Sequence, residues 1–480
     1  MATLMSDRHA RDHGRERVTP RLLALCLVVA VQAPALHLDQ PESTIAVSGR
    51  AISTPAELTA ALRRGGTIDL ADGVTFDGAF RITVNGTVLN GHGSTLHGNV
   101  TPAQPALTIT ASDVAVRDLS ATSTSANTVI QCGANDTTQT TLGQVPTNVT
   151  MSHVVVPAAR GKRGIEYHCS GTIDHVEILD VYDPAGRDSQ GFYAVNTPGP
   201  IRITNSLFQA GSEPLLIGGD TTRIPGVVPS DIVIEDTELS RPLSWQSDGV
   251  KRKVKNLLEL KTGRHVIARR LTLSGAWRDG QDGYAVVITP HSGGDIHDVT
   301  LEDITARNVG GCLQLLGQEY SGPPTPSPVS GLVIRRFTCV ASKASFGGRG
   351  VFALITGEPS DITIADSIGI LDGTASIVYD PGTVLNPDGT KRPGGPIGSL
   401  TLTGTYLVAG TPYGINLAGT MNGLNNPRGV TTLTVTGNTF ADAPAALRKN
   451  LPNNTYVTRS AFDALFVDAA AGDYRLKGRQ

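Results

Sequence analysis

The sequence predicts an all-β chain that folds as a parallel β-helix, a solenoid, with a short capping helix at its N-terminal end. Three observations support this fold class. A short motif recurs eleven times between residues 113 and 440, and a second β-rich motif follows it in most repeats. The apolar spacing of an α-helix is almost absent from both motifs. One strand cannot bury its own apolar face, so each copy must stack on the next.

Each copy of the first motif combines a polar or glycine residue, an alternating apolar run and a turn. Examples are DVAVRDLSA at 113–121, DIVIEDTEL at 231–239 and TLTVTGNTF at 432–440. The residues at the equivalent position of the eleven copies are Asp118, His153, His175, Asn205, Asp236, Arg270, Asp303, Arg336, Asp366, Gly404 and Gly437. Most steps between them are 30 to 38 residues. This variation predicts a coil of constant size with surface loops of different lengths.

The second motif is a short β-rich run that ends in glycine or proline. It reads VIQCG at 129–133, LLIGGD at 215–220 and VVITPHSGG at 286–294. An apolar run followed by these residues is typical of a strand and a turn. Helical repeats would instead need Ala-, Leu-, Glu- and Lys-rich runs of about 10–12 residues in each repeat. We therefore predict two strand ladders.

The two ends of the chain differ from the repeats. Residues 1–35 resemble an export signal, because five arginines precede an apolar run at 22–31 and a small-residue cleavage site at 33–35. Thr54, Pro55 and Glu57 predict the start of a helix that covers the open end of the stack. The predicted segments are a signal peptide (1–35), a linker (36–50), an N-terminal cap with the first coil (51–112), the repeats (113–440) and a C-terminal capping tail (441–480).

Composition and export define the expected surroundings of the protein. Removal of residues 1–35 leaves 35 basic and 40 acidic residues, a net charge of −5. We expect a secreted, periplasmic or cell-surface monomer without membrane attachment after signal cleavage and without a nucleic-acid partner. Cys132 and Cys169 end equivalent strands of adjacent repeats, so they either form a disulfide or pack as small buried residues. Cys312 and Cys339 are less well aligned.

Several segments resemble the pectate-lyase-like superfamily of right-handed parallel β-helices. STPAELTAALRRGGTIDLADGVTFDGAF (53–80) is similar to its N-terminal cap, LNGHGSTLHG (89–98) to its first coil, and FVDAAAGDYRLK (466–477) to its closing segment. The resemblance covers the chain after the signal and implies the right-handed fold, but it does not specify an activity. The catalytic series of polygalacturonases is absent. Glu259 and Lys261 lie on a strand comparable to the catalytic strand of chondroitinase-B-like and alginate-lyase-like members.

The segment from Arg241 to Arg270 has the strongest charge signal in the sequence. Nine basic residues lie in it, opposed within the segment only by Asp248 and Glu259. A local excess of +7 favours a polyanion, and for an exported β-helix we expect an acidic, uronic-acid-containing polysaccharide. A solvated loop is the alternative interpretation.

β-Elimination is the reaction that this segment favours. It removes the proton next to a uronate carboxylate, and it needs a base, a group that neutralises the carboxylate and a proton donor for the leaving oxygen. Lys261 is the candidate base, and Tyr284 or His291 is the candidate donor. A polysaccharide lyase is therefore favoured over a glycoside hydrolase.

Four nearby residues are candidates for substrate binding. Arg264 and Arg278 would neutralise the uronate carboxylate, and Lys255 adds to the basic segment. Trp277, one of two tryptophans in the chain, would stack on a sugar ring, although packing under a loop is equally plausible.

Three carboxylates in the same region have two possible roles. Glu259, Asp279 and Asp282 are candidate ligands for Ca²⁺, the one cofactor that we expect. A second alternative is hydrolysis, in which two of these carboxylates flank the glycosidic bond. Asp279 and Asp282 also lie in an Asp-Gly-Gln-Asp-Gly sequence that is typical of a simple turn.

Other interpretations remain open. A non-catalytic polysaccharide-binding protein, similar to an adhesin or a tailspike, is the main alternative to an enzyme. Glu166, His168 and Asp188 form a second, weaker candidate site, because a histidine on a strand is more often structural than catalytic.

Overall fold

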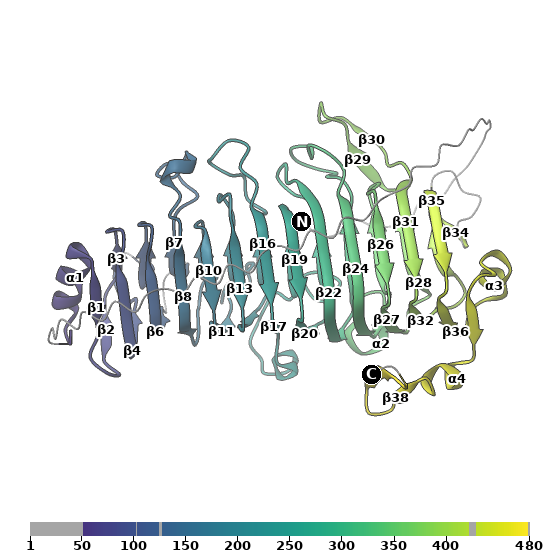
Figure 1. Ribbon diagram of the computed structural model, residues 1–480, viewed down its shortest axis with the longest axis horizontal. Coiled ribbons are helices and arrows are strands. Elements are labelled where there is room, and N and C mark those ends of the chain that lie inside the picture. The colour runs from purple at the N-terminus through teal and green to yellow at the C-terminus, as the bar shows by residue number, and fades with distance from the viewer. Residues whose placement is uncertain (1–50, 102, 124–126, 422–428, 479–480) are drawn as a thin grey trace. The chain divides into compact units, whose positions relative to one another are not determined.

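The computed structural model describes residues 51–478 apart from Pro102, residues 124–126 and residues 422–428. The predicted signal peptide (1–35) and linker (36–50) lie outside the described residues. The described part is mostly β with few helices, and its two large sheets consist of parallel strands except for one antiparallel pair (Figure 1). No helix in that part is long and apolar enough to cross a membrane.

The larger sheet has 22 strands. They are β1 (Thr67–Asp69), β2 (Thr75–Asp77), β4 (Val88–His97), β6 (Ala115–Thr122), β8 (Val149–Val156), β10 (Gly171–Asp174), β11 (Glu177–Val181), β13 (Ile201–Thr204), β14 (Leu207–Ala210), β16 (Ser230–Glu235), β17 (Glu238–Ser240), β19 (Gly263–Arg269), β20 (Thr272–Ala276), β22 (Ile296–Val309), β24 (Ser330–Ala341), β26 (Ile362–Ala365), β27 (Ile368–Leu371), β31 (Ile397–Thr403), β32 (Tyr406–Val408), β35 (Val430–Thr436), β36 (Thr439–Ala441) and β37 (Thr455–Val457). We call it the 22-strand sheet.

The smaller sheet has 13 strands and is called the 13-strand sheet. They are β3 (Phe80–Ile82), β5 (Leu107–Ile109), β7 (Thr128–Cys132), β9 (Arg163–Tyr167), β12 (Gln190–Ala194), β15 (Glu213–Ile217), β18 (Leu258–Leu260), β21 (Tyr284–Ile288), β23 (Gly311–Leu316), β25 (Ala353–Thr356), β28 (Ala375–Asp380), β33 (Gly414–Leu417) and β34 (Thr420–Met421). β33 and β34 are its antiparallel pair. Two further antiparallel pairs are β29 (Thr383–Leu385) with β30 (Lys391–Pro393), and β38 (Phe466–Asp468) with β39 (Asp473–Leu476).

In-register pairing between successive repeats builds the core. Ile173 pairs with Ile203 and Ile203 with Ile234, so that equivalent apolar side chains stack, and all three are fully buried. Aromatic rings also pack between the two sheets, with Phe192 of β12 and Phe208 of β14 stacked at 5.8 Å between ring centroids. Each repeat thus buries the apolar face of its neighbour, as the alternating pattern predicts.

A row of left-handed residues marks the bend of the first motif in every repeat. All eleven residues predicted to be equivalent, from Asp118 to Gly437, have φ between 47° and 67°. Several of them end one strand of the 22-strand sheet or lie just before the next, as His175 does between β10 and β11. Polar residues such as Asp and Asn tolerate this conformation better than β-branched residues. We call these eleven residues the turn row.

Short helices lie at the two ends of the strand array. α1 (Pro55–Arg64) begins at Thr54, whose side chain accepts a hydrogen bond from the amide of Glu57, and it buries Leu58 and Leu62 in the core. Figure 1 shows α1 at the end of the array beside β1 and β3. The other helices are α2 (Lys343–Phe346), α3 (Ala445–Asn450) and α4 (Arg459–Asp463). Leu447 and Phe462 of the last two are fully buried.

Both cysteine pairs are disulfides in the structure. Cys132 bonds to Cys169, and Cys312 bonds to Cys339. Each bond joins neighbouring repeats, with Cα–Cα distances of 5.8 and 6.1 Å. For Cys132 and Cys169 the structure thus has the disulfide rather than two separate buried thiols.

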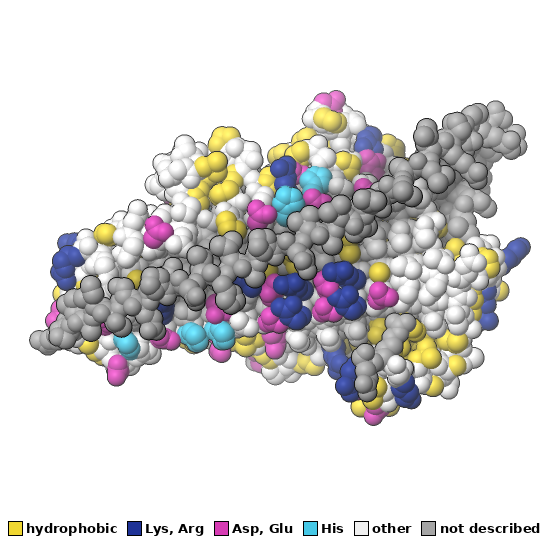
Figure 2. Space-filling view, viewed as in Figure 1, with side chains coloured by type: hydrophobic (Ala, Val, Ile, Leu, Met, Phe, Trp, Pro, Cys, Tyr) yellow, Lys and Arg dark blue, Asp and Glu magenta, His cyan; other side chains and the backbone are white. Residues whose placement is uncertain are grey.

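Two adjacent columns of the 22-strand sheet alternate in charge from repeat to repeat. The residues are Glu235 with Asp236, Arg269 with Arg270, Glu302 with Asp303, and Arg335 with Arg336. Their ion pairs include Arg269 to Glu235 at 2.5 Å and Arg335 to Glu302 at 2.8 Å. Figure 2 shows acidic and basic side chains next to one another on this face. We call these eight residues the charge ladder.

Candidate functional site

Acidic residues from neighbouring repeats neutralise the basic segment. Arg241 is fully buried and donates to five backbone carbonyl oxygens, those of Ala210, Gly211, Ser212, Asn256 and Gly275. Seven others form ion pairs: Arg252 with Asp180 and Asp248, Lys253 with Asp188, Lys255 with Asp188 and Glu213, Lys261 with Glu259, Arg264 with Asp295, and Arg269 and Arg270 with Glu235. The local excess of +7 counted in the segment is therefore largely compensated in the structure, because several of the opposing acids are distant in sequence.

A cluster of carboxylates and lysines lies at strands β15 and β18 of the 13-strand sheet. We call it the carboxyl cluster; its members are Asp188, Glu213, Lys255, Glu259 and Lys261. The Lys255 Nζ lies 2.5 Å from Asp188 Oδ2 and 3.2 Å from Glu213 Oε1. The Lys261 Nζ lies 2.8 Å from Glu259 Oε1. The two glutamates are 1% exposed, whereas the Asp188 side chain is 40% exposed and connects the cluster to solvent.

Burial and nearby charges move the pKa values of the two glutamates in opposite directions. Burial raises the pKa of Glu213 from 4.5 to about 7, although Lys255 opposes this rise. Burial also disfavours ionised Glu259, but Lys261 lowers the pKa of Glu259 below its usual value, and the charge of Lys255 adds to this effect. Glu213 therefore holds a proton near neutral pH while Glu259 is ionised. Two carboxyl groups with separated pKa values are the usual basis of acid–base chemistry.

Amide side chains fix the orientation of both glutamates. Gln190 donates to Glu213 Oε2 at 2.9 Å, and Asn256 donates to Glu259 Oε2 at 3.0 Å. Asn256 also donates to Gln281 at 2.9 Å. These bonds hold the carboxyl pair in one geometry, which acid–base catalysis requires.

The structure brings the predicted residues Lys261 and His291 to the same edge of the 13-strand sheet. The amide of His291 donates to the carbonyl of Lys261 at 3.2 Å. The His291 side chain is 45% exposed, and its Nδ1 lies 3.0 Å from Oε2 of the buried Glu319. Backbone amides of Tyr320 and Ser321 donate to the other oxygen of Glu319. His291 is thus an accessible imidazole with a fixed carboxylate behind it, next to Lys261.

Tyr284 is not part of this accessible edge. It is fully buried and packs against Val287, Val351 and Leu354. Burial raises the pKa of the Tyr284 hydroxyl above its usual value of 10. The predicted role of Tyr284 as a proton donor to substrate requires access to substrate, so this burial contradicts it.

The remaining predicted residues form a turn and do not form a metal centre. The Asp279 carboxylate accepts a hydrogen bond from the Val254 amide at 2.9 Å, and Asp282 lies 3.6 Å from Arg278. Trp277 is half-buried. No group of three or more His, Cys, Asp and Glu side chains among the described residues is arranged to hold a metal ion. Glu259, Asp279 and Asp282 therefore do not fit the predicted Ca²⁺ site, because Glu259 is paired with Lys261.

A second polar cluster lies earlier in the same sheet. Glu166 lies 2.7 Å from Arg163 and 3.1 Å from His168, and Thr128 donates to it at 2.7 Å. Burial disfavours the ionised form of Glu166, but His168 and Arg163 lower the pKa of Glu166 to about 2. Because His168 is fully buried, we regard this cluster as structural. Asp188, predicted to lie with these residues, belongs to the carboxyl cluster instead.

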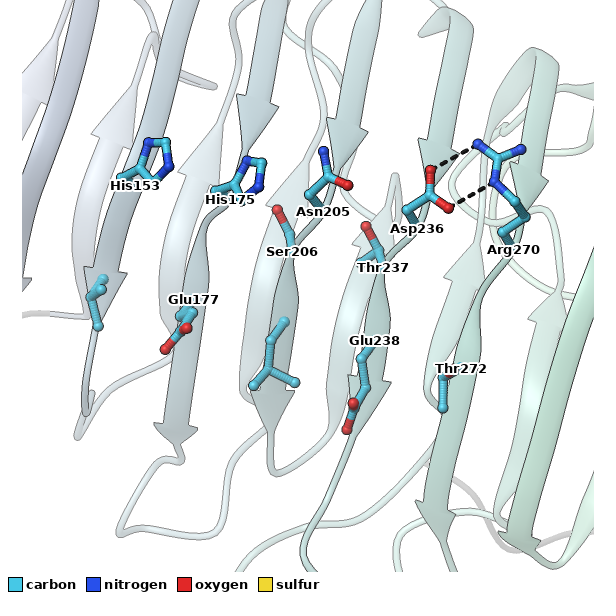
Figure 3. Close-up of a pocket in the computed structure, with 12 residues that line it drawn as sticks. His153, His175, Glu177, Asn205, Ser206, Asp236, Thr237, Glu238, Arg270 and Thr272 are labelled. Atoms are coloured by element: carbon cyan, nitrogen blue, oxygen red, sulfur yellow. Dashed lines mark hydrogen bonds and ion pairs between the residues drawn. The ribbon is translucent and has the colours of Figure 1, made fainter.

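A groove of about 680 Å³ lies on the 22-strand sheet. Figure 3 shows turn-row residues from His153 to Arg270 along it, and the stacked rings of His153 and His175 have centroids 4.8 Å apart. The lining residues are His153, Val155, His175, Glu177, Asn205, Ser206, Leu207, Asp236, Thr237, Glu238, Arg270 and Thr272. We call it the histidine groove.

Comparison with known proteins gives structural matches alone. No protein-family model matches the chain, and no curated protein matches its sequence. The catalytic domain of a GH87 alpha-1,3-glucanase in complex with nigerose is 11% identical, with a TM-score of 0.41. The match covers 78% of this chain and 60% of the glucanase chain, so the chain spans less than two thirds of that protein.

Two further matches have similar identity. A tailspike protein of an E. coli bacteriophage, in complex with a pentasaccharide, is 12% identical, with a TM-score of 0.44 and coverage of 87% of this chain and 78% of that chain. An alginate lyase from Paenibacillus is 15% identical, with a TM-score of 0.29 and coverage of 81% and 98%. At these identities and TM-scores, any similarity to the three proteins concerns the fold alone.

The sequence identifies some members of the carboxyl cluster as candidate site residues but not others. Glu259 and Lys261 lie in the conspicuous basic segment, whereas Glu213 is an isolated acid in SEPLLIGGD. Its neighbours come from residues 188 and 255–261, and no local pattern connects these segments. An acidic residue at the start of a buried strand is the one signal that Glu213 gives.

Proposed function

We propose that the chain is a right-handed parallel β-helix, capped by α1, that acts on a polysaccharide by acid–base chemistry at the carboxyl cluster. One observation carries this proposal. Glu213 and Glu259 are buried side by side with their pKa values moved apart, and Lys255 and Lys261 connect them to the surface. Such a pair exchanges a proton close to neutral pH.

β-Elimination on a uronic-acid-containing polymer is the reaction that we favour. Hydrolysis needs two carboxyl groups on either side of the glycosidic bond, at least about 5 Å apart. Glu213 and Glu259 are each 1% exposed and lie behind Lys255 and Lys261, so neither carboxyl group can flank a glycosidic bond directly. Asp279 and Asp282 are held by a backbone amide and by arginines, so they do not supply the missing carboxylate.

Each step of the elimination has a candidate residue. Lys253 and Lys255 would attract the substrate carboxylate, and Arg264 and Arg278 are accessible cations farther along the surface. Lys261 would pass a proton to Glu259 and then accept the proton next to the uronate carboxylate. His291, held by Glu319, would protonate the leaving oxygen. We derive no step through Ca²⁺.

We further propose that the protein is exported and works as a monomer. Two disulfides support an oxidising compartment, because disulfides are uncommon in the cytosol. The positively charged segment and apolar run of the first 35 residues give the same indication from the sequence.

A substrate panel tests the proposed reaction. The mature chain is incubated with pectate, alginate, hyaluronan, chondroitin, heparosan and gellan, each with and without Ca²⁺. Ultraviolet absorbance reports unsaturated uronate ends, and reducing ends are counted in parallel. We expect absorbance and reducing ends to rise together on one polymer. Reducing ends without absorbance would replace elimination with hydrolysis.

Two lysine variants connect that activity to the carboxyl cluster. Lys261→Met should lower kcat by a factor of about 100 or more, because it removes the base. Lys251→Met is the matched control, since Lys251 belongs to the same basic segment but is exposed and outside the cluster. Equal activity of both variants would exclude Lys261 as the base.

Polysaccharide binding without catalysis is a second candidate, and the histidine groove favours it. The groove crosses several repeats and exposes stacked imidazoles, amides and hydroxyls, which suit the hydroxyl groups of a sugar chain. Affinity electrophoresis on the same polymers tests it. His175→Ala should weaken retardation on one polymer without changing the absorbance assay, and unchanged retardation on every polymer would remove this candidate.

A further inference from the structure

Asp295, His297 and Ser330 lie together where the chain enters strands β22 and β24. His297 and Ser330 are register partners on these neighbouring strands, and Asp295 immediately precedes β22. We propose that these three residues, named the Ser330 site, form a nucleophilic acyl-transfer centre that hydrolyses O-acyl esters. This activity is separate from the elimination chemistry of the carboxyl cluster.

The contact distances fit a nucleophile, a base and an orienting carboxylate. The Ser330 Oγ lies 2.8 Å from His297 Nδ1. The other ring nitrogen, Nε2, lies 2.6 Å from Asp295 Oδ1 and 2.9 Å from Ser327 Oγ. A proton on Nε2 is hydrogen-bonded to Ser327 Oγ, with the Asp295 carboxylate in ion-pair contact beside it, and Nδ1 is then the acceptor for the Ser330 hydroxyl proton.

Burial and the contact with Arg264 hold Asp295 in a fixed position. Its side chain is 2% exposed, and Arg264 binds Oδ2 through Nε at 2.9 Å and also through Nη2. The backbone of Asp295 is held as well, because its carbonyl accepts from the amide of Gly263 at 2.8 Å and from Thr262 Oγ1 at 3.2 Å. The orienting group of the site thus has little freedom.

The site is also open to a ligand. The His297 side chain is 23% exposed, and Ser330 is half-buried. The Arg264 side chain is 47% exposed and occupies the register position next to His297. Arg264 lies on the opposite side of His297 from Ser330, so its guanidinium holds Asp295 and marks the exposed edge of the site.

The reaction is balanced with these groups and water. Ser330 Oγ attacks the ester carbonyl carbon while His297 Nδ1 takes the hydroxyl proton, and Asp295 stabilises the imidazolium. Collapse of the intermediate breaks the bond to the alcohol oxygen, which receives the proton from His297. Water then hydrolyses the acyl-serine by the same proton transfers, releasing a carboxylic acid and restoring Ser330.

The position in the chain indicates the class of ester. Segment 291–297 connects the Ser330 site to His291 at the edge of the carboxyl cluster, and Gly294 donates back to the His291 carbonyl at 3.0 Å. We infer that the substrate is an O-acetyl or similar small acyl group on the same polysaccharide. The polysaccharide part of this inference rests on the proposed function, whereas the esterase part stands without it.

The first experiment measures ester cleavage and covalent labelling together. p-Nitrophenyl acetate is the substrate, and a fluorophosphonate probe followed by peptide mass spectrometry reports the reactive serine. We expect hydrolysis above the buffer rate and a label on Ser330. Ser330→Ala should lower hydrolysis at least roughly 100-fold. His297→Gln should abolish the label although Ser330 is still present, which separates loss of activation from loss of the nucleophile.

Two matched controls complete the design. Ser230 occupies the equivalent register position three repeats earlier, beside Arg264 but without a histidine, so Ser230→Ala should retain full activity. Ser327→Ala should still be labelled on Ser330, at a lower rate, because Ser327 also contacts His297 Nε2. A label on Ser327, equal rates in Ser330→Ala and wild type, or no label at all would overturn the proposal, provided that thermal unfolding shows every variant to be folded.

Acetylated and deacetylated forms of the panel polymers separate this proposal from the elimination. Acetate release that is lost in Ser330→Ala but kept in Lys261→Met supports the Ser330 site even if no polymer is cleaved. Elimination without acetate release, together with no hydrolysis of p-nitrophenyl acetate, would leave the proposed function intact and exclude the esterase.

Discussion

Replacement of Glu213 by glutamine should increase stability at alkaline pH and abolish catalysis. Glu213→Gln has the shape of the protonated glutamic acid, and its amide oxygen can still accept from Gln190. The wild-type side chain has a pKa of about 7 in the folded protein, because burial disfavours its charged form, against 4.5 for an exposed glutamate. Like protonation, the substitution gives up the ion pair with Lys255, so the variant removes a buried ionisation and otherwise resembles the protonated wild type.

The sign and size of the effect follow from these two values. Below pH 4.5 the side chain is protonated in both the folded and the unfolded protein, so it makes no difference to the free energy of unfolding. Between pH 4.5 and 7 the unfolded chain ionises first, and the wild type loses stability as pH rises. A displacement from 4.5 to 7 corresponds to about 3 kcal/mol at pH 8. Glu213→Gln avoids this loss.

Denaturant unfolding at pH 5, 6, 7 and 8 measures the effect. We expect nearly equal unfolding free energies of the two proteins at pH 5 and a more stable variant at pH 8. Glu235→Gln is the control, because Glu235 is a buried carboxylate that pairs with arginines of the charge ladder. This substitution should lower the unfolding free energy at both pH 5 and pH 8. If the difference in unfolding free energy between wild type and Glu213→Gln were the same at every pH, Glu213 would not have the raised pKa assigned to it.

Three further predictions concern stability. Replacing Cys132 and Cys169 by serine should lower the unfolding free energy by about 4 kcal/mol, because the disulfide closes a loop of 37 residues in the unfolded chain. Calorimetry of the wild type and the double variant without reducing agent measures the difference. Arg241→Met should cost more than about 3 kcal/mol, because it leaves five buried carbonyl oxygens without their donor, and the yield and melting temperature of the variant report it. The pKa of Glu166 is about 2 in the folded protein, so the wild type loses free energy of unfolding as pH falls from 4.5 to 2, and Glu166→Gln should lose less. Acid titration followed by circular dichroism tests this. An unchanged midpoint of acid unfolding would contradict it.

Periodicity made much of the strand arrangement predictable. Residues such as Asn205 and Asp366 were aligned by the polar position of a short motif, and each adopts the left-handed conformation that this position requires. Thr54 and Glu57 likewise located the start of α1, because helix capping is a local property. These features depend on residues that are close in sequence, which is why a single chain contains the information.

The site was less predictable because its partners come from different repeats. Lys255 reaches Asp188 across 67 positions, and the loop lengths that determine this contact have no simple pattern. The net charge counted for the basic segment alone therefore omits the acidic side chains of other segments that pair with it in the structure. Tyr284 was misplaced for a related reason, since the covering residues Val351 and Leu354 belong to later repeats. Lys261 and His291, which are one repeat apart, were correctly placed near each other.

The charge ladder restricts how this chain can change its length. Acidic and basic pairs alternate with a period of two repeats, from Glu235 through Arg269 and Glu302 to Arg335. Deleting one of the middle repeats would place like charges against each other in both columns, whereas deleting two would restore the original matching. Gain or loss of repeats in this part of the molecule should therefore be tolerated in even numbers, both in engineered variants and in descendants of the sequence.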